Sequence, residues 1–286
     1  YCGVFTAKVD GVQFYLLDNE YYFKRRGIYG FFDDGERFAF FAKACLEMLQ
    51  YIDFEPDLIH ANDWQTALIP VFLNAFYRHI PRYSELKTVL TIHNIQYQGK
   101  YDERVSADVL GLPEEQRRLV EYDGCTNYLK GGICAADAVT TVSPTYSREI
   151  MDPWYAYGLD GILRQNSFKL TGILNGIDVA GYNPATDPVI AQNYSLEDIS
   201  LREENRRELA DQVGLPLGEN TMLIGIVSRL VAQKGMDLIR YILPRMLAEH
   251  RDLAVAMVGS GDREYEEFFA EMRRRFPGQM GFVQGF

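Results

Sequence analysis

Residues Gly225–Gly235 read GIVSRLVAQKG, and this stretch organises the second half of the chain. An apolar run, Met222–Val227, has the length of a β-strand, and a helical pattern follows the stretch. Two cations, Arg229 and Lys234, stand between them. Ligands bind α/β sheets at the carboxyl ends of the strands, beside the helix starts. The spacing therefore predicts two fixed cations at a binding edge, placed to hold a diphosphate and to stabilise the charge that grows on it as it leaves.

A plainer interpretation of the same letters is a solvated turn between a strand and a helix. Short motifs have many chance matches, so this stretch taken alone favours the solvated turn. The rest of the sequence has to supply the argument.

The bulk composition indicates a globular protein. The 286 residues are enough for about two domains, and a sequence that is 47% hydrophobic and 24% charged can fill a large core. The net charge of −11 argues against a general nucleic-acid binder. No apolar run approaches the roughly 20 residues of a membrane span, and no signal peptide is visible. The four cysteines have neither metal-ligand nor redox spacing, which favours reduced thiols in a cytoplasmic or plastid interior.

Both ends of the sequence look like cut points. There is no initiator Met, Tyr1 begins inside an apolar segment, and the final letters MGFVQGF are typical of a strand just completed. We therefore expect an internal piece of a longer protein, with the fold incomplete in this chain.

Strand patterns alternate with helical patterns along the sequence, which predicts an α/β fold with a parallel sheet covered on both faces. The segment 177–189, IDVAGYNPATDPV, breaks the alternation and is interpreted as a linker. The sequence thus predicts two domains, residues 1–180 and 181–286. In the first, strands are expected over 12–19, 56–64, 87–94, 138–143 and 170–176, with residues 95–101 as a loop and a helix over 126–137. In the second, a charged helix is expected over 196–213.

Three predicted strand exits in the first domain carry polar side chains: His60, Asn62, Asp63 and Trp64 at one, His93 and Asn94 at the next, and Asn175 at the third. A sugar is recognised by convergent hydrogen bonds to its hydroxyls beside an aromatic face, and these residue types suit that task.

Each of these residues also has a purely structural interpretation. His60 fits a hydrogen-bonded histidine in a packing layer, Asp63 fits an N-cap, and His93 fits a buried histidine bonded to backbone. Asn175 fits a turn with the glycine that follows it. Three polar exits in one sheet nevertheless favour a shared site.

Two other classes of site receive weaker support. The histidines and Asp63 do not stand at a metal-ligand spacing, so no metal site is predicted. GSGD at residues 259–262 is part of a Gly-rich loop but lacks the full dinucleotide fingerprint, which leaves a dinucleotide-dependent oxidoreductase as a weak alternative.

With these residues identified, the chain resembles the bacterial glycogen synthases and plant starch synthases. The matching blocks are HANDW, TIHNIQYQG, LKGGICAADAVTTVSPTYSREI, YGLDGIL, GILNGIDVAGYNPATD and VSRLVAQKG, which run from residue 60 to 235 in family order. Several blocks in order are far more specific than any one of them.

The resemblance implies a GT-B fold, with two Rossmann-like domains facing across a cleft. It implies transfer of glucose from ADP-glucose to the non-reducing end of an α-1,4-glucan, with retention and without a metal or other cofactor. Arg229 and Lys234 match the family's diphosphate-binding cations, and His93 matches the histidine that contacts the donor glucose. Residues that match the lining of the glucose pocket are Asp63, Trp64, Asn94 and Asn175. On this basis we expect the first-domain residues to face the two cations.

The resemblance also marks what this chain lacks. The family's N-terminal Lys-x-Gly-Gly loop would precede Tyr1, and its C-terminal acidic loop would follow Phe286. The sequence does not decide whether the donor is ADP-glucose or UDP-glucose, or whether the acceptor is glycogen or starch. It also leaves the oligomeric state open. Two alternatives to a glucan synthase are a different retaining GT-B transferase that uses UDP-glucose and a catalytically inactive glucan-binding piece.

Overall fold

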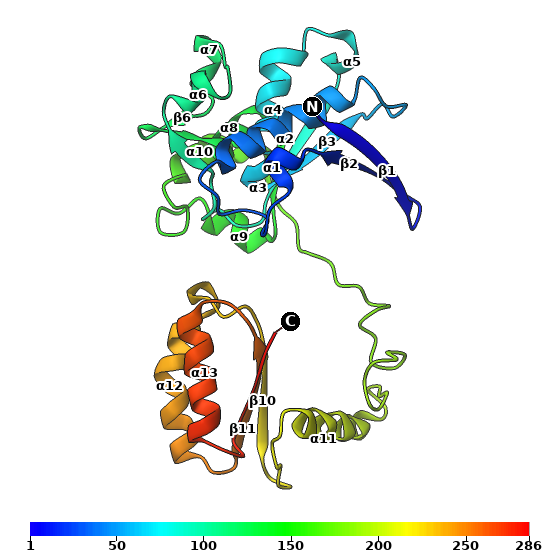
Figure 1. Ribbon diagram of the computed structural model, residues 1–286, viewed down its shortest axis with the longest axis vertical. Helices are drawn as coiled ribbons and strands as arrows, with labels where there is room; N and C mark the ends of the chain where they lie inside the picture. Colours follow the sequence, from blue (N-terminus) through cyan, green and yellow to red (C-terminus); the bar gives the residue numbers. More distant parts are fainter. Residues whose placement is uncertain (286) are drawn as a thin grey trace. The chain divides into compact units, whose positions relative to one another are not determined.

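The computed structural model describes residues 1–285. The chain divides into two compact units, Tyr1–Gly176 and Ile177–Phe286, where the sequence placed the boundary between residues 180 and 181. Each unit is an α/β structure built on a parallel sheet, as predicted. Figure 1 shows the course of the chain through both units.

The first unit is organised around a four-stranded sheet in the order β3-β4-β8-β9. All neighbouring pairs are parallel. The strands are β3 (Leu58–Asn62), β4 (Lys87–Ile92), β8 (Ala138–Thr141) and β9 (Leu170–Gly172). Because the strands are parallel, their carboxyl ends meet at one edge, and this edge carries the predicted site residues of β3 and β4.

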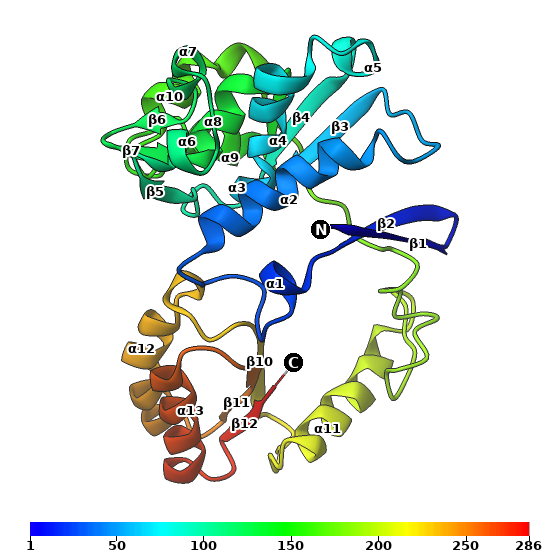
Figure 2. The same cartoon turned by 45° about the horizontal axis from the view of Figure 1, so that its top comes forward.

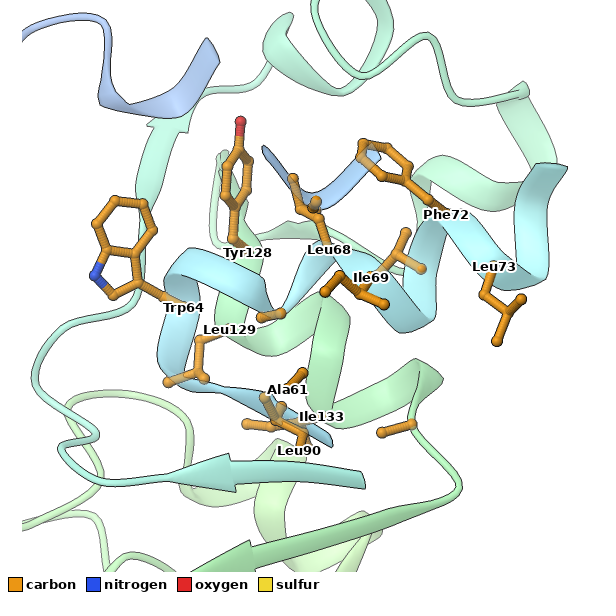
Figure 3. Close-up of a cluster of buried hydrophobic side chains, with 14 of the residues drawn as sticks. Ala61, Trp64, Leu68, Ile69, Phe72, Leu73, Leu90, Tyr128, Leu129 and Ile133 are labelled. Atoms are coloured by element: carbon orange, nitrogen blue, oxygen red, sulfur yellow. The ribbon is translucent and has the colours of Figure 1, made fainter. Parts of the chain in front are cut away.

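One face of this sheet carries the core. Ala61 pairs with Leu90, and Leu90 pairs with Val139, so the three side chains share a face, and all are buried. Figure 3 shows Ala61 and Leu90 beside Ile133 of the helix that covers them. The covering helices are α2 (Asp34–Met48), α3 (Asp63–Thr66), α4 (Leu68–Phe72), which runs into a π-helical turn (Leu73–Tyr77), and α8 (Tyr128–Ala135).

Small residues let α8 approach its neighbours closely. A Cβ on Gly132 would lie 2.7 Å from the Cβ of Ala67, and one on Gly131 would lie 2.6 Å from Val120. Such distances are shorter than van der Waals contact, so any larger side chain would push the helix outward. The two glycines of LKGGI are therefore packing residues in this fold.

The prediction that helices cover both faces is wrong at the edge strands β3 and β9 of this sheet, whereas Thr91 of the central strand β4 is buried on the second face. Leu58, His60 and Asn62 alternate onto the second face of β3, and all three are exposed. Thr171 on β9 shares that face and is exposed as well. The helices of the first unit contribute to one hydrophobic cluster, on the Ala61 face.

Two antiparallel elements were not predicted. One is the hairpin in which β2 (Val12–Asp18), which was predicted as a strand, pairs with β1 (Gly3–Val9); it projects from the first unit in Figure 2. The other is a small sheet, β5-β7-β6, of β5 (Lys100–Asp102), β6 (Glu121–Tyr122) and β7 (Cys125–Asn127). The predicted loop 95–101 therefore ends in a strand, and the helix predicted from residue 126 begins at Tyr128, with Asn127 as its N-cap.

The remaining elements of the first unit are short and lie mostly at its periphery. They are α1 (Glu20–Phe23), α5 (Pro81–Ser84), α6 (Val105–Asp108), α7 (Glu114–Arg117), α9 (Pro144–Glu149), α10 (Asp160–Gln165) and a 3-10 turn (Ser167–Lys169). Ser143 caps α9, since its Oγ accepts from the backbone N–H of Tyr146 at 2.8 Å, and Pro144 is the first helical residue. That start was predicted from the sequence and is confirmed.

The second unit contains the parallel sheet β10-β11-β12. Its strands are β10 (Met222–Val227), β11 (Leu253–Gly259) and β12 (Met280–Gln284). Two helices, α12 (Met236–Glu249) and α13 (Arg263–Arg275), lie side by side on one face (Figures 1 and 2). The charged helix α11 (Arg202–Gln212) follows a 3-10 turn (Ile199–Leu201) and starts later than predicted; its last turns pack on Ala254 and Ala256 of β11.

Candidate functional site

The carboxyl ends of β3 and β4 are tied together by Asp63. Its Oδ1 accepts from the backbone N–H of His93 at 2.8 Å and from that of Asn94 at 3.4 Å. Asp63 takes a left-handed backbone conformation, with φ of 56°, which is uncommon for a residue other than glycine. The N-cap interpretation of Asp63 is wrong, because Asn62 occupies the cap position of α3. The Asp63 carboxylate instead accepts hydrogen bonds from the backbone that follows β4.

His93 is an exposed side chain at the end of β4. Its Nε2 lies 2.9 Å from Oδ1 of Asn62. The alternative of a buried histidine bonded to backbone is therefore wrong. The ring is available to a ligand at the carboxyl edge of the sheet.

Asn94 is half-buried and shapes the loop that leaves β4. Its Oδ1 accepts from the backbone N–H of Gln96 at 3.0 Å. The hydroxyl of Tyr146 on α9 accepts from the backbone N–H of Ile95 at 3.2 Å. Burial raises the pKa of the Tyr146 hydroxyl, whose oxygen accepts this bond without the help of its own proton. These bonds fix the start of the loop beside His93.

Trp64 is mainly a core residue. It is 8% exposed, and its ring packs edge-on against Phe38 with centroids 5.0 Å apart. Its accessible edge borders a groove of about 580 Å³ that is completed by residues 96–100 and by Tyr157. Its role in a glucose pocket stays a prediction, but its role in the core is evident (Figure 3).

His60 does not join the residues at the strand ends. Its Nε2 lies 2.6 Å from Oγ1 of Thr91, which lies 2.6 Å from Oγ1 of Thr140. This polar row crosses β3, β4 and β8 on the second face of the sheet, and Thr91 in its middle is buried. The structural interpretation of His60 is right about its hydrogen bonding, but the side chain is exposed.

Asn175 lies three residues beyond the end of β9, because the strand stops at Gly172. It is exposed, and among residues 1–285 its side chain has no hydrogen-bond partner. Its place in the site stays a prediction that nothing in the first unit fixes.

The second unit places Arg229 and Lys234 where the sequence predicted them, after β10 and before α12. Lys234 ends a 3-10 turn (Ala232–Lys234), and Gly235 follows with φ of 72° at the N-cap of α12. Both cations are exposed, and neither forms an ion pair or hydrogen bond with the rest of the described chain. Two unpaired cations on one turn suit an anionic ligand. That they meet the residues of the first unit across a cleft stays a prediction.

Sequence reasoning missed what holds this cationic loop. A Cβ on Gly259 would overlap the carbonyl oxygen of Ser228, and one on Gly261 would overlap that of Leu230. Backbone bonds join the two loops, with Leu230 N donating to Ser260 O at 2.9 Å and Asp262 N donating to Leu230 O at 2.8 Å. The glycines of GSGD are thus explained by close loop packing beside Arg229. The sequence does contain the signal, because two glycines that follow a predicted strand allow another loop to approach closely.

Residues 1–285 contain neither a metal-binding group of side chains nor a membrane-spanning helix. No group of three or more His, Cys, Asp or Glu side chains is arranged to hold a metal ion. No helix in this range is long and apolar enough to cross a membrane.

Comparison with known proteins decides the family. The family model described as the starch synthase catalytic domain matches residues 1–165. The chain belongs to this family. The recognition made from the ordered sequence blocks is thereby confirmed.

The relatives of this starch synthase family member include two bacterial glycogen synthases. The protein of Bacillus cereus (strain B4264) is 44% identical over 288 aligned residues, which cover 100% of this chain and 60% of that protein. The protein of Desulforamulus reducens is 47% identical over 97% of this chain and 58% of its own length. The chain therefore spans about three-fifths of the length of the curated relatives it matches.

A solved structure matches both units. The catalytic domain of starch synthase IV from Arabidopsis thaliana, bound to ADP and acarbose, aligns with a TM-score of 0.84 and 31% identity. The alignment covers 99% of this chain and 59% of that one. The predicted GT-B class, present here in part, is confirmed by this match.

Proposed function

We propose that the protein to which this chain belongs is a retaining hexosyltransferase, which moves glucose from ADP-glucose to the non-reducing end of an α-1,4-glucan. The observation that carries the proposal is family membership across the site: His93, Arg229 and Lys234 all fall within segments aligned to the glycogen synthases. The solved relative was bound to ADP and to acarbose, which is consistent with a nucleotide donor and a glucan acceptor.

The proposed division of labour follows from charge. Arg229 and Lys234 bind the diphosphate of the donor and offset the negative charge that builds up as ADP leaves. His93 and Asn94 hold the glucose at the carboxyl edge of the first sheet, with Asp63 fixing their backbone. Asn175 and the accessible edge of Trp64 complete the glucose pocket in this proposal.

The chemistry needs one bond to break and one to form at the anomeric carbon. The bond from that carbon to the phosphate oxygen breaks through an oxocarbenium-like state. The acceptor hydroxyl forms the new bond from the face that ADP leaves, and its proton passes to the departing phosphate oxygen. Attack on the same face gives retention without the pair of carboxylates that retaining glycosidases use.

Other features of the proposal are less specific to this site. The acceptor is glycogen or starch, no cofactor or metal takes part, and neither nucleic acid nor a membrane is a partner. The compartment is the cytoplasm, or a plastid if the source is a plant or an alga. The choice of donor separates this proposal from its alternative: the proposed enzyme uses ADP-glucose, whereas the alternative retaining GT-B transferase uses UDP-glucose.

A donor assay on the full-length protein tests the proposal. We expect ADP-glucose with glycogen to yield ADP and longer α-1,4-linked chains, and UDP-glucose to be used far more slowly. His93→Ala is expected to reduce the rate strongly, whereas His79→Ala serves as the matched control, since His79 is an exposed histidine between the π turn and α5. Faster transfer from UDP-glucose, or hydrolysis of the donor without chain growth, contradicts the proposal.

A further inference from the structure

Asn62 lies between a backbone carbonyl and the ring of His93, and the carbonyl fixes the orientation of its amide. Its Nδ2 donates to the backbone carbonyl of His60 at 3.4 Å, and its Oδ1 lies 2.9 Å from Nε2 of His93. A carbonyl oxygen only accepts hydrogen bonds, so the reversed amide would set one acceptor against another. Asn62 therefore presents its oxygen to the histidine ring.

This orientation determines where the proton of His93 is. Because an amide oxygen cannot donate, Nε2 must carry the hydrogen. In a neutral imidazole the other nitrogen, Nδ1, then holds a lone pair. Among residues 1–285, no group other than Asn62 hydrogen-bonds to this ring, and the side chain is exposed. Nδ1 is thus an unoccupied acceptor at the carboxyl edge of the sheet.

The backbones of both partners are held in place independently of this bond. Oγ1 of Thr66 accepts from the N–H of Asn62 at 2.6 Å and donates to its C=O at 2.7 Å. The N–H of His93 is held by the carboxylate of Asp63 at 2.8 Å. Only side-chain torsions remain to be ordered, so the bond forms at a small entropic cost even at an exposed position.

We propose that Asn62 is a positioning residue that holds His93 as its Nε2–H tautomer and so keeps Nδ1 as an acceptor for a hydroxyl of the bound ligand. Asp63 fixes the backbone of His93, and Asn62 fixes its ring and its proton. The ligand part of this inference rests on the proposed function, because a sugar supplies the hydroxyl. The tautomer part rests on the first unit alone.

Nitrogen NMR tests the tautomer directly. The chain is labelled with ¹⁵N-histidine and studied at about pH 8.5, well above the usual range of imidazole titration near 6.5. His93→Gln assigns the His93 signals among the four histidines. We expect Nε2 to be the protonated nitrogen, with Asn62→Ala reducing the Nε2–H to Nδ1–H ratio about fivefold, the effect of losing a bond worth about 1 kcal/mol.

Two controls make the result specific. Asn62→Asp keeps an acceptor facing the ring and should retain the Nε2–H tautomer. His79 provides an internal control, since it lies between the π turn and α5, forms no hydrogen bond with Asn62, and should keep its signals unchanged in either variant. An unchanged His93 ratio in Asn62→Ala, or loss of the tautomer in Asn62→Asp while His79 is unaffected, overturns the inference.

Kinetics of the full-length protein test the ligand part separately. A bond worth about 1 kcal/mol bounds the combined loss of tautomer and ring orientation, so Asn62→Ala should lower kcat/KM for ADP-glucose by at most about fivefold. The affinity for ADP alone should stay unchanged, and Asn62→Asp should retain more activity than Asn62→Ala. An altered tautomer with unchanged kcat/KM overturns the ligand part. A protein that shows the tautomer but transfers no glucose overturns the proposed function and leaves the tautomer part standing.

Discussion

At the scale of single residues, the cations and the histidine have different expected effects. In the full-length protein, Arg229→Ala or Lys234→Ala should lower kcat on the order of 10²-fold or more, as loss of one preorganised charge stabiliser does. The charge on the diphosphate is larger in the transition state than in bound donor, so these contacts lower the barrier as well as tightening binding. Lys234→Arg should not restore activity fully, because a planar fork does not replace a compact ammonium.

His93→Ala should also slow turnover, but through lost placement of the glucose ring, so ADP alone should bind nearly as before. ADP affinity by calorimetry and kcat are measured for each variant. Arg251→Ala is the matched control, since Arg251 is an exposed arginine before β11, at the other end of the strands. Normal turnover in the Arg229 and Lys234 variants, together with weak ADP binding in the His93 variant, would mean that the roles are assigned wrongly.

Asp137 predicts a pH dependence of stability at the opposite edge of the first sheet. Burial raises the pKa of its carboxyl, but hydrogen bonds from Thr88 N at 2.8 Å and Thr88 Oγ1 at 2.9 Å, with Arg78 and Lys87 nearby, lower the pKa further than burial raises it. A folded-state pKa below the unfolded value means that the carboxylate stabilises the fold above about pH 4 and that this contribution is lost as pH falls through the folded value.

Asp137→Asn should therefore destabilise the first unit at pH 7, and the difference from the unsubstituted chain should shrink as the pH falls below about 4. Urea unfolding followed at several pH values measures it. Asp211→Asn, on the exposed face of α11, is the control. A difference that stays constant down to acidic pH would show that the charge of Asp137 is not what stabilises this edge.

At the scale of elements, Gly99 joins the loop after β4 to β5. It has φ of 63°, and a Cβ there would lie 2.5 Å from Cε3 of Trp64. Gly99→Ala should cost about 3 kcal/mol, the sum of a left-handed backbone penalty and overpacking against a core ring. Gly124→Ala is the matched control, since Gly124 has φ of 69° but nothing within 4 Å of its Cβ, and should cost only about 1 kcal/mol.

Unfolding of the first unit, followed by tryptophan fluorescence, compares the two glycine variants. The larger loss for Gly99→Ala is expected because the buried Trp64 ring cannot move without disturbing Phe38. Equal losses for both variants would refute the close approach of this loop to the ring.

A structural feature could be predicted when the residues that form it lie close together in the sequence and follow a local pattern. The ends of β3, β4 and β10 were predictable, because each follows an apolar run that stops at polar residues. The small sheet β5-β7-β6 was not, since strands of two or three residues carry no period. The exposure of the edge strands β3 and β9 on their second face was missed, because alternating strands and helices do not show how far the cover extends toward the edges of a sheet.

The same limit applies to the site. The sequence singled out Asp63 and His93 separately, yet the bond between them joins residues 30 positions apart and appears only when β3 and β4 pair. Trp64 looked like a sugar platform, and the fold puts most of its ring in the core. Gly259 and Gly261 are required because the loop after β10 packs against them, and no local sequence pattern shows that contact.

At the scale of the whole molecule, the proposed reaction draws its positive charge from side chains. Arg229 and Lys234 are both exposed and unpaired among the described residues, so the donor diphosphate does not have to compete with an existing carboxylate partner for them. Two such groups supply the two positive charges that a divalent ion would otherwise bring to a leaving diphosphate. Activity of the full-length protein should therefore survive exhaustive treatment with EDTA.

The measurement compares kcat with ADP-glucose and glycogen before and after chelation, and again after addition of Mg²⁺ or Mn²⁺. We expect less than a twofold change in all three conditions, because the charge offset is covalently part of the chain. Arg229→Ala serves as the comparison variant. If a divalent ion restores activity to this variant but does not change the activity of the unsubstituted protein, the guanidinium of Arg229 performs the role that a metal could perform. Loss of turnover on chelation that a divalent ion restores in the unsubstituted protein would instead show that side-chain cations alone do not stabilise the leaving group.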